Sequence, residues 1–186
     1  MSDSTLVKSA HIAATVLAAL TSGGIVGISV FTIPAIALPS RNATGRARET
    51  PGAPVSHIAQ QWSLVYNTGK VVFPSMAAAS ALLYSYVAYA VRGGAGGSRA
   101  RCASNLYFTA AGLVLMIVPI TGVLVFPVNE KIEPYVEERD DKLVDEGPQD
   151  SEFPGLLRKW AQVNAIRGLF PAIGAALGAT VGFGLI

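Results

Sequence analysis

The stretch from Leu106 to Val128, LYFTAAGLVLMIVPITGVLVFPV, contains no Asp, Glu, Lys, Arg or His. A bilayer core about 30 Å thick needs roughly 20 apolar residues in a helix to cross it. The stretch therefore predicts a membrane-spanning helix, interrupted at Pro119. A helix is expected because every backbone group in lipid must find its hydrogen-bond partner within the segment.

Three further apolar stretches of similar length occur along the chain. With the polar turns that lead into them, we expect four spans at about 10–38, 57–91, 104–128 and 157–186. The first is too long for the apolar region of a signal peptide, so we expect it to be retained. The predicted fold is an all-α bundle of four transmembrane helices, with both termini on one side of the membrane.

The composition also indicates a membrane protein. Apolar types make up 51% of the chain and charged types 14%, against roughly 25% charged residues in soluble domains. The length of 186 residues suits one integral membrane domain, residues 1–186. Most acidic residues lie between Glu130 and Glu152, which predicts a polar acidic loop at about 129–156. A net charge of +2 gives no indication of a nucleic-acid-binding surface.

Cysteine and histidine are too few for the common cofactor sites. The single cysteine, Cys102, excludes an internal disulfide and a thiol redox pair. His11 and His57 are expected on opposite sides of the membrane, too far apart to bind one haem or one metal ion together. We therefore predict neither a metal site nor a haem.

Glycines recur at four-residue spacing in two of the spans. Gly174, Gly178 and Gly182 form one series, and Gly23 and Gly27 form another. Small residues at this spacing let helix backbones approach closely in lipid. We therefore predict that both series pack against neighbouring helices.

Polar and aromatic residues gather where the second span begins. At 100° per residue, Trp62 and Tyr66 fall on one stripe of the helix, and His57 and Gln61 fall on another. One stripe could line a pocket while the other faces a neighbouring helix, and the sequence does not decide between them. Lys70 follows at the boundary of the span, where a lysine often extends to the membrane surface.

The fourth span opens with a one-sided polar set. Trp160, Asn164 and Arg167 stand at i, i+4 and i+7, within about 60° of one another. A charge at mid-bilayer costs about 2.5–3.5 kcal/mol, so such residues usually face a bundle interior or a wet cavity. Asn129 directly follows the third span and is expected at the same membrane level. The alternative interpretation is an interfacial aromatic belt with an arginine that extends to the surface.

The order and spacing of these residues resemble the anthrone oxygenase family. The residues that carry the resemblance are His57, Trp62-x3-Tyr66-x2-Gly69, Pro74, Asn129-Glu130-Lys131 and Trp160-x3-Asn164-x2-Arg167. The resemblance covers nearly the whole chain, except the acidic stretch from Glu133 to Glu152. It implies a four-span membrane protein of fungal aromatic polyketide biosynthesis.

The family resemblance also implies a reaction. An anthrone is oxidised by O2 at its central methylene to an anthraquinone, with O2 as co-substrate and no metal or organic cofactor. Within that reaction we expect His57 to act as the base, with Lys70 as the alternative, and Asn164 and Arg167 to stabilise the enolate oxygen. The expected substrate-binding residues are Trp62, Tyr66, Gln61, Trp160, Asn129 and Lys70. His57→Ala is expected to abolish most turnover.

Other functions stay open at this point. A non-enzymatic four-span scaffold, a small-molecule binding or transport protein, or a metal enzyme with carboxylates from the acidic loop could share many of these features. The one-sided set on the fourth span favours a pocket, because a scaffold needs such a face less than a binding pocket does. The expected partners are a small aromatic polyketide and the lipid bilayer, with no nucleic acid. Orientation, oligomeric state and the membrane itself are not decided, and the endoplasmic reticulum or another endomembrane is a candidate.

Overall fold

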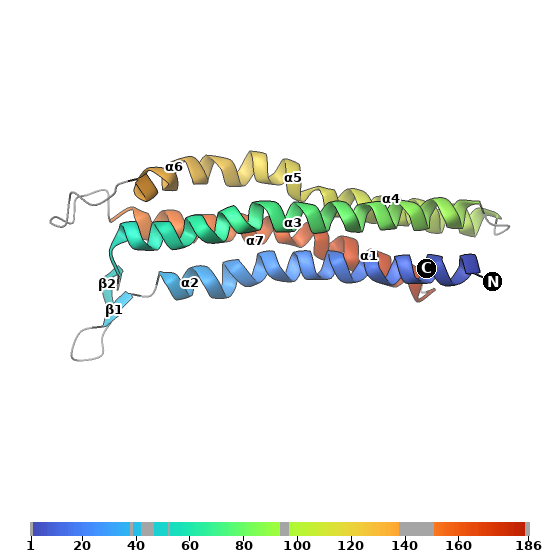
Figure 1. The fold of residues 1–186 in the computed structure, drawn as a ribbon, viewed down its shortest axis with the longest axis horizontal. Coiled ribbons are helices and arrows are strands. Elements are labelled where there is room, and N and C mark those ends of the chain that lie inside the picture. Colours follow the sequence, from blue (N-terminus) through green and yellow to red (C-terminus); the bar gives the residue numbers. More distant parts are fainter. Residues whose placement is uncertain are drawn as a thin grey trace.

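Four long helical segments run side by side in the computed structural model (Figure 1). Each is long and apolar enough to cross a membrane. The protein is therefore an all-α bundle of four transmembrane helices, which confirms the predicted fold class. The structure describes residues 2–37, 39–41, 47–51, 53–93, 97–137 and 151–184.

Two of the four segments are single helices, and two contain a short π-helical stretch. The first segment comprises α1 (Ser2–Gly27), the π-helix η1 (Ile28–Thr32) and α2 (Ile33–Ile36). The second is α3 (Val55–Arg92) and the fourth is α7 (Phe153–Gly182). The third comprises α4 (Gly97–Leu115), α5 (Ile117–Ile120), the π-helix η2 (Thr121–Val125) and α6 (Phe126–Glu137).

The third segment extends further than predicted. Helix α6 runs through Glu137 and α7 begins at Phe153, so the loop predicted at 129–156 is wrong at both ends. The helix continues because Val128 and Ile132, one turn apart, are both buried against neighbouring helices. Residues 138–150, which hold much of the acidic stretch, lie outside the described part of the chain.

A short antiparallel hairpin connects α2 to α3 and was not predicted. Strand β1 (Pro39–Arg41) pairs with β2 (Ala47–Pro51), with Pro39 opposite Pro51. The hairpin stands outside the helical bundle, so it leaves the four-helix architecture unchanged (Figure 1).

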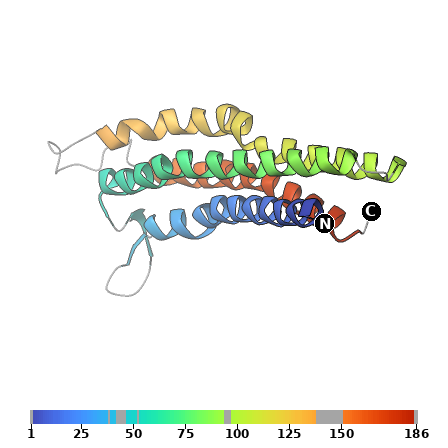
Figure 2. The ribbon, with the colours of Figure 1, turned by 45° about the vertical axis from the view of Figure 1, so that its right-hand side comes forward.

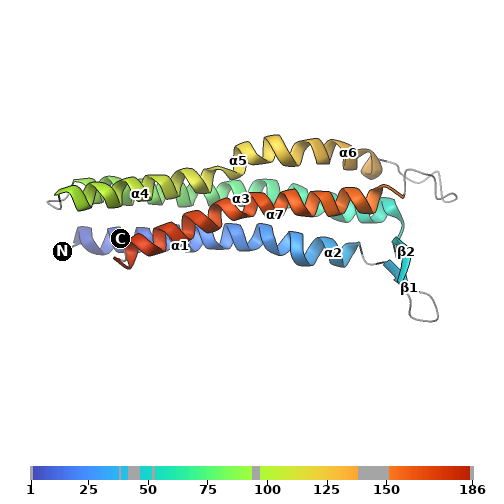
Figure 3. The ribbon, with the colours of Figure 1, turned by 180° about the vertical axis from the view of Figure 1, so that it is seen from behind.

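The two ends of the bundle differ. The beginning of α1 and the end of α7 lie where α3 turns into α4, as expected for an even number of spans (Figures 1 and 3). We call this the termini end. The hairpin, the end of α6 and the beginning of α7 lie at the opposite end, which we call the loop end. The four segments remain adjacent when the molecule is turned (Figure 2).

The glycines of α7 pack against other helices, which confirms the prediction for this series. Gly174 approaches the backbone of α4, Gly178 lies against the ring of Tyr84, and Gly182 lies against the ring of His11. The three glycines thus face α4, α3 and α1 in turn, and α7 is closely surrounded in the termini half.

The prediction for Gly23 and Gly27 is wrong. Apart from the nearby backbone of α1 itself and the neighbouring residues, no atom of the described residues lies within 4 Å of the position that a Cβ would take at either residue. Gly24, one position further round α1, makes the close contact instead, with the ring of Phe73. Gly23 and Gly27 do lie on one face of α1, but within the described part of the chain this face does not contact another helix.

Candidate functional site

A buried group of aromatic side chains lies in the loop half of the bundle. Trp62 of α3 and Trp160 of α7 are 1% and 2% exposed. Their rings meet edge to face with 5.9 Å between centroids. Trp62 also stacks on the half-buried ring of Tyr66, with centroids 5.4 Å apart and planes 3° apart. Stacked and edge-to-face pairs of this kind add stability beyond the buried area.

Asn129 connects the aromatic rings to α6. The indole Nε1 of Trp160 donates a hydrogen bond of 2.8 Å to the Oδ1 of Asn129, which is 3% exposed. The hydroxyl of Tyr66 interacts with the Asn129 side chain and lies within electrostatic reach of the Glu133 carboxylate and the Arg167 guanidinium. Helices α3, α6 and α7 therefore contribute to one polar and aromatic cluster.

Asn164 extends the cluster to the first helical segment. Its side chain is fully buried, and its Nδ2 donates to the backbone oxygen of Ile25 at 3.0 Å and to the Oγ of Ser29 at 2.8 Å. Ser29 is buried and lies in η1. Sequence reasoning did not predict Ile25 or Ser29 as partners.

Arg167 is a buried cation without a carboxylate partner in the described residues. It is 6% exposed, and its Nη1 donates a hydrogen bond of 2.9 Å to the Oγ1 of Thr121. The titratable side chain that interacts with it is the neutral phenol of Tyr66 rather than an Asp or Glu. A guanidinium carries five N–H donors in a planar fork, so most of its hydrogen-bonding capacity remains available. We call Trp62, Tyr66, Asn129, Trp160, Asn164 and Arg167 the buried cluster.

Both hydroxyl partners belong to π-helical turns. Ser29 lies in η1 and Thr121 begins η2. Each π-helix ends two residues before a proline, Pro34 or Pro127. Proline lacks an N–H and its ring crowds the carbonyl four residues earlier, so the preceding turn loses its α-helical bond. Such π-helical turns are rare and often occur at functional sites. A Ser or Thr five or six residues before a proline within a span is the sequence signal that could have identified Ser29 and Thr121.

Unpartnered buried polar atoms concentrate in the buried cluster. Five side-chain atoms of the described residues are buried without a hydrogen-bond partner, and four of them belong to it. They are Trp62 Nε1, Asn129 Nδ2, Asn164 Oδ1 and Arg167 Nε. A buried donor or acceptor without a partner costs about 1–3 kcal/mol. The cluster therefore has the capacity to receive a polar ligand atom.

Three predicted site residues lie outside the buried cluster. His57 and Gln61 are exposed, and their Nε2 atoms lie 3.2 Å apart on the outer side of α3. The stripe carrying Trp62 faces inward, which resolves the choice that the sequence left open. Lys70 is also exposed, and its Nζ lies 5.5 Å from the centre of the Tyr66 ring. The structure thus brings together six of the nine predicted residues.

The histidines lie at opposite ends of the bundle, as predicted. His11 lies in the termini half, where its Nε2 is 2.9 Å from the backbone oxygen of Gly178. His57 begins α3 at the loop end. Among the described residues, no three His, Cys, Asp or Glu side chains are grouped so that they could hold a metal ion.

Comparison with protein families identifies the group to which these features belong. The family model described as anthrone oxygenase matches residues 62–177, more than half of the chain. The chain belongs to the anthrone oxygenase family. The part of the chain that matches the anthrone oxygenase model begins at Trp62 and contains the entire buried cluster. His57 and Gln61 precede this part.

Curated relatives of the anthrone oxygenase family cover nearly the same length. The chain is 29% identical to an anthrone oxygenase of Cryptosporiopsis sp. over 93% of this chain and 85% of that protein. It is 30% identical to a monooxygenase of Dothistroma septosporum over 84% and 74% of the two chains. It is 28% identical to an anthrone oxygenase of Aspergillus fumigatus over 89% and 88%. No solved structure matches the chain. The family model and the names of these relatives identify the protein as an oxidoreductase.

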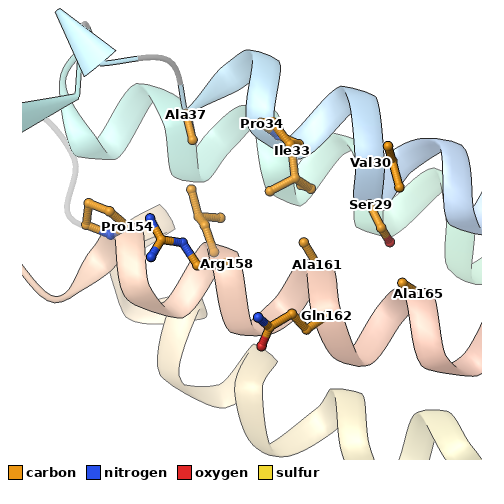
Figure 4. A pocket seen from close by; sticks show the side chains of 11 residues that line it. Ser29, Val30, Ile33, Pro34, Ala37, Pro154, Arg158, Ala161, Gln162 and Ala165 are labelled. Atoms are coloured by element: carbon orange, nitrogen blue, oxygen red, sulfur yellow. The ribbon is translucent and has the colours of Figure 1, made fainter. Parts of the chain in front are cut away.

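A groove opens beside the buried cluster, between the first helical segment and α7 (Figure 4). Its volume is about 450 Å³. One wall is formed by residues 29–37 and the other by residues 154–165. Ser29 belongs to this lining and accepts a hydrogen bond from Asn164, so it connects the groove to the buried cluster.

Proposed function

We propose that this protein oxidises an anthrone to the corresponding anthraquinone with O2, without a metal or an organic cofactor. Relatives named anthrone oxygenase support the choice of substrate. To the family assignment we add three proposals. They concern the substrate, the absence of a cofactor and the roles of individual residues.

The observation that carries the proposal is the buried guanidinium of Arg167. It has an unpartnered Nε and lies in a cluster with three aromatic rings and two amides. An unpaired buried charge is expensive for a membrane protein to keep. A flat aromatic substrate whose carbonyl becomes an enolate would supply both ring contacts and the missing negative charge.

The chemistry needs no cofactor because the substrate is the electron donor. Loss of a proton from the central methylene gives the anthranolate, an electron-rich anion. It transfers one electron to O2, and the resulting radical and superoxide combine into a C–O bond. Protonation gives the hydroperoxide, and loss of the remaining C–H proton with cleavage of the O–O bond gives the quinone and water. One anthrone and one O2 are thus converted into one quinone and one H2O.

In this proposal Arg167 stabilises the enolate oxygen, together with the free amide donor of Asn129. A preorganised donor at a developing oxyanion contributes about 10²–10³-fold to the rate. Trp62, Tyr66 and Trp160 provide the ring contacts. Enolate stabilisation makes the methylene more acidic, so a weak base, including solvent at the membrane surface, is sufficient.

We leave His57 outside the catalytic set, contrary to the expectation from the sequence. Its ring is exposed and lies beside the side chain of Gln61, on the stripe of α3 that faces away from the buried cluster. A general base has to come within hydrogen-bond reach of the proton that it removes. Lys70 is likewise exposed and approaches the cluster through the ring of Tyr66.

The test is oxidation of 1,8-dihydroxyanthrone by the purified protein in detergent or nanodiscs. We expect quinone absorbance to appear faster than in protein-free controls, with one O2 consumed for each quinone formed. Elemental analysis and absorption spectra of the active sample should show no stoichiometric metal or flavin. Quinone formation at the uncatalysed rate would overturn the proposed activity, and activity that requires an added metal would overturn the absence of a cofactor.

A further inference from the structure

We propose that the groove between the first helical segment and α7 is the docking site of the substrate, a flat aromatic carrying phenolic hydroxyls, and that Arg158 recognises one of these phenols. The inference rests on the proposed function, since it assigns the place where that substrate first docks before it reaches the buried cluster. It concerns none of the residues that we expect to stabilise the enolate.

The shape of the groove suits a small flat ligand. Its volume of about 450 Å³ lies within the range of small-molecule sites, roughly 300–1,000 Å³. Ile33 and Ala161 face each other across it from the two walls (Figure 4). The lining is mostly aliphatic, with Val30, Pro34 and Ala165 among its members. The small residues Ala161 and Ala165 on the α7 wall leave space between the walls in which a ring could lie.

A cation stands at the loop end of this apolar groove. Arg158 belongs to the lining, is exposed and lies beside Pro154, at the end of the groove nearest the hairpin (Figure 4). Arginine offers planar paired donors, which suit an ionised or hydrogen-bonding phenol. An apolar slot with one terminal guanidinium is therefore complementary to a hydroxylated aromatic, with its polar edge at the membrane surface.

The inner end of the groove reaches the buried cluster through Ser29. The Oγ of Ser29 donates to the backbone oxygen of Ile25 at 3.1 Å and accepts from Asn164. A hydroxyl oxygen can accept two hydrogen bonds, so Ser29 retains one position for a ligand. The wall residues of α7 and the residues of the buried cluster lie about a third of a turn apart on the same helix. A ligand between the walls would thus lie next to the buried cluster without touching its rings, and it would have to pass Ser29 to reach Arg167.

The variants that test this site fill the groove or remove its charge. Ala165→Phe fills it from the α7 wall and Val30→Trp from the opposite wall, where Val30 is already 53% exposed. Ile166→Phe is the matched control, because Ile166 is the next residue of α7 and is 45% exposed outside the groove lining. Arg158→Gln removes the charge, and Lys159→Gln is its neighbouring control.

We expect Ala165→Phe and Val30→Trp to lower kcat/KM for 1,8-dihydroxyanthrone at least tenfold, mainly through KM, while Ile166→Phe stays within about twofold. Arg158→Gln should raise KM by about two- to fivefold, the range of one exposed charged pair. Unsubstituted anthrone, which lacks phenols, should be less affected by Arg158→Gln. Lys159→Gln should change neither substrate.

Binding of the unreactive product 1,8-dihydroxyanthraquinone, followed by quenching of tryptophan fluorescence, separates this inference from the proposed function. One possible result is that wild type binds this probe, Ala165→Phe weakens the binding, and wild type does not turn over an anthrone. The docking site would then stand and the oxygenase proposal would fail. If wild type turns over anthrone and both filling variants behave like Ile166→Phe, the docking site is refuted. If Ala165→Phe does not fold, Val30→Trp alone decides.

Discussion

Replacing Arg167 by methionine should separate catalysis from stability. The side chain is 6% exposed and makes one hydrogen bond within the described part of the chain, from Nη1 to the Oγ1 of Thr121. Methionine keeps the length of the apolar stem but removes the charge and all five donors. If Arg167 stabilises the enolate oxygen, turnover should fall by about 10²–10³-fold, which corresponds to about 2.7–4 kcal/mol.

The folded protein should lose little stability from the same change. A buried hydrogen bond to a charged group contributes about 1.5–3 kcal/mol, whereas an intramembrane charge costs up to about 2.5–3.5 kcal/mol and less near the interface. The two contributions nearly cancel, and the hydroxyl of Thr121 still donates to the backbone oxygen of Ile117. We therefore expect the free energy of unfolding to change by no more than about 1 kcal/mol.

The assay measures the initial rate of quinone absorbance in nanodiscs, with thermal unfolding measured on the same samples. Arg92→Met, at an exposed position near the termini end of α3, is the control for loss of one positive charge. Turnover of Arg167→Met within threefold of wild type would refute the assigned role. A large loss of stability together with activity would instead indicate a structural role.

Three further changes test other contacts. Asn129→Leu leaves the buried indole N–H of Trp160 without its acceptor, so unfolding in detergent should become easier by about 1–3 kcal/mol; unchanged stability would mean that this bond is not formed. His57→Ala should retain turnover within about threefold, since the ring is exposed; a loss above 100-fold in the quinone assay would restore His57 as the base. Gly178→Ala should lower the free energy of unfolding by about 1–3 kcal/mol, because a Cβ there would collide with the ring of Tyr84 in α3. The control is Gly112→Ala, where a Cβ has open space and the change should be neutral or slightly stabilising. Equal unfolding temperatures for the two glycine variants would contradict the packing described for α7.

The parts of this structure that follow from local chemistry could be predicted from the sequence. Apolar stretches of sufficient length gave the four helices, because backbone hydrogen bonding in lipid leaves few alternatives. The spacing of Trp160, Asn164 and Arg167 correctly indicated an inward face, since burial of a charge and an amide on one stripe requires partners.

The parts that depend on contacts between distant segments could not be predicted. Ser29 and Thr121 hydrogen-bond to residues of α7 and lie in the π-helices before Pro34 and Pro127. Sequence spacing alone does not show which helix lies opposite. The orientation of α3 was also undetermined, since both of its stripes contain polar residues. This is why His57 was expected beside the other site residues but lies on the outer face.

The most direct test of the central claim is the absorption spectrum of 1,8-dihydroxyanthrone bound to the protein without O2. With no oxidant present, the reaction stops after the first proton is lost. We predict that wild-type protein at neutral pH shows the spectrum of the anthranolate and that Arg167→Met shows the neutral substrate. A neutral spectrum for the substrate bound to wild-type protein, or the same anthranolate spectrum with both proteins, would contradict the claim that the buried guanidinium stabilises the enolate.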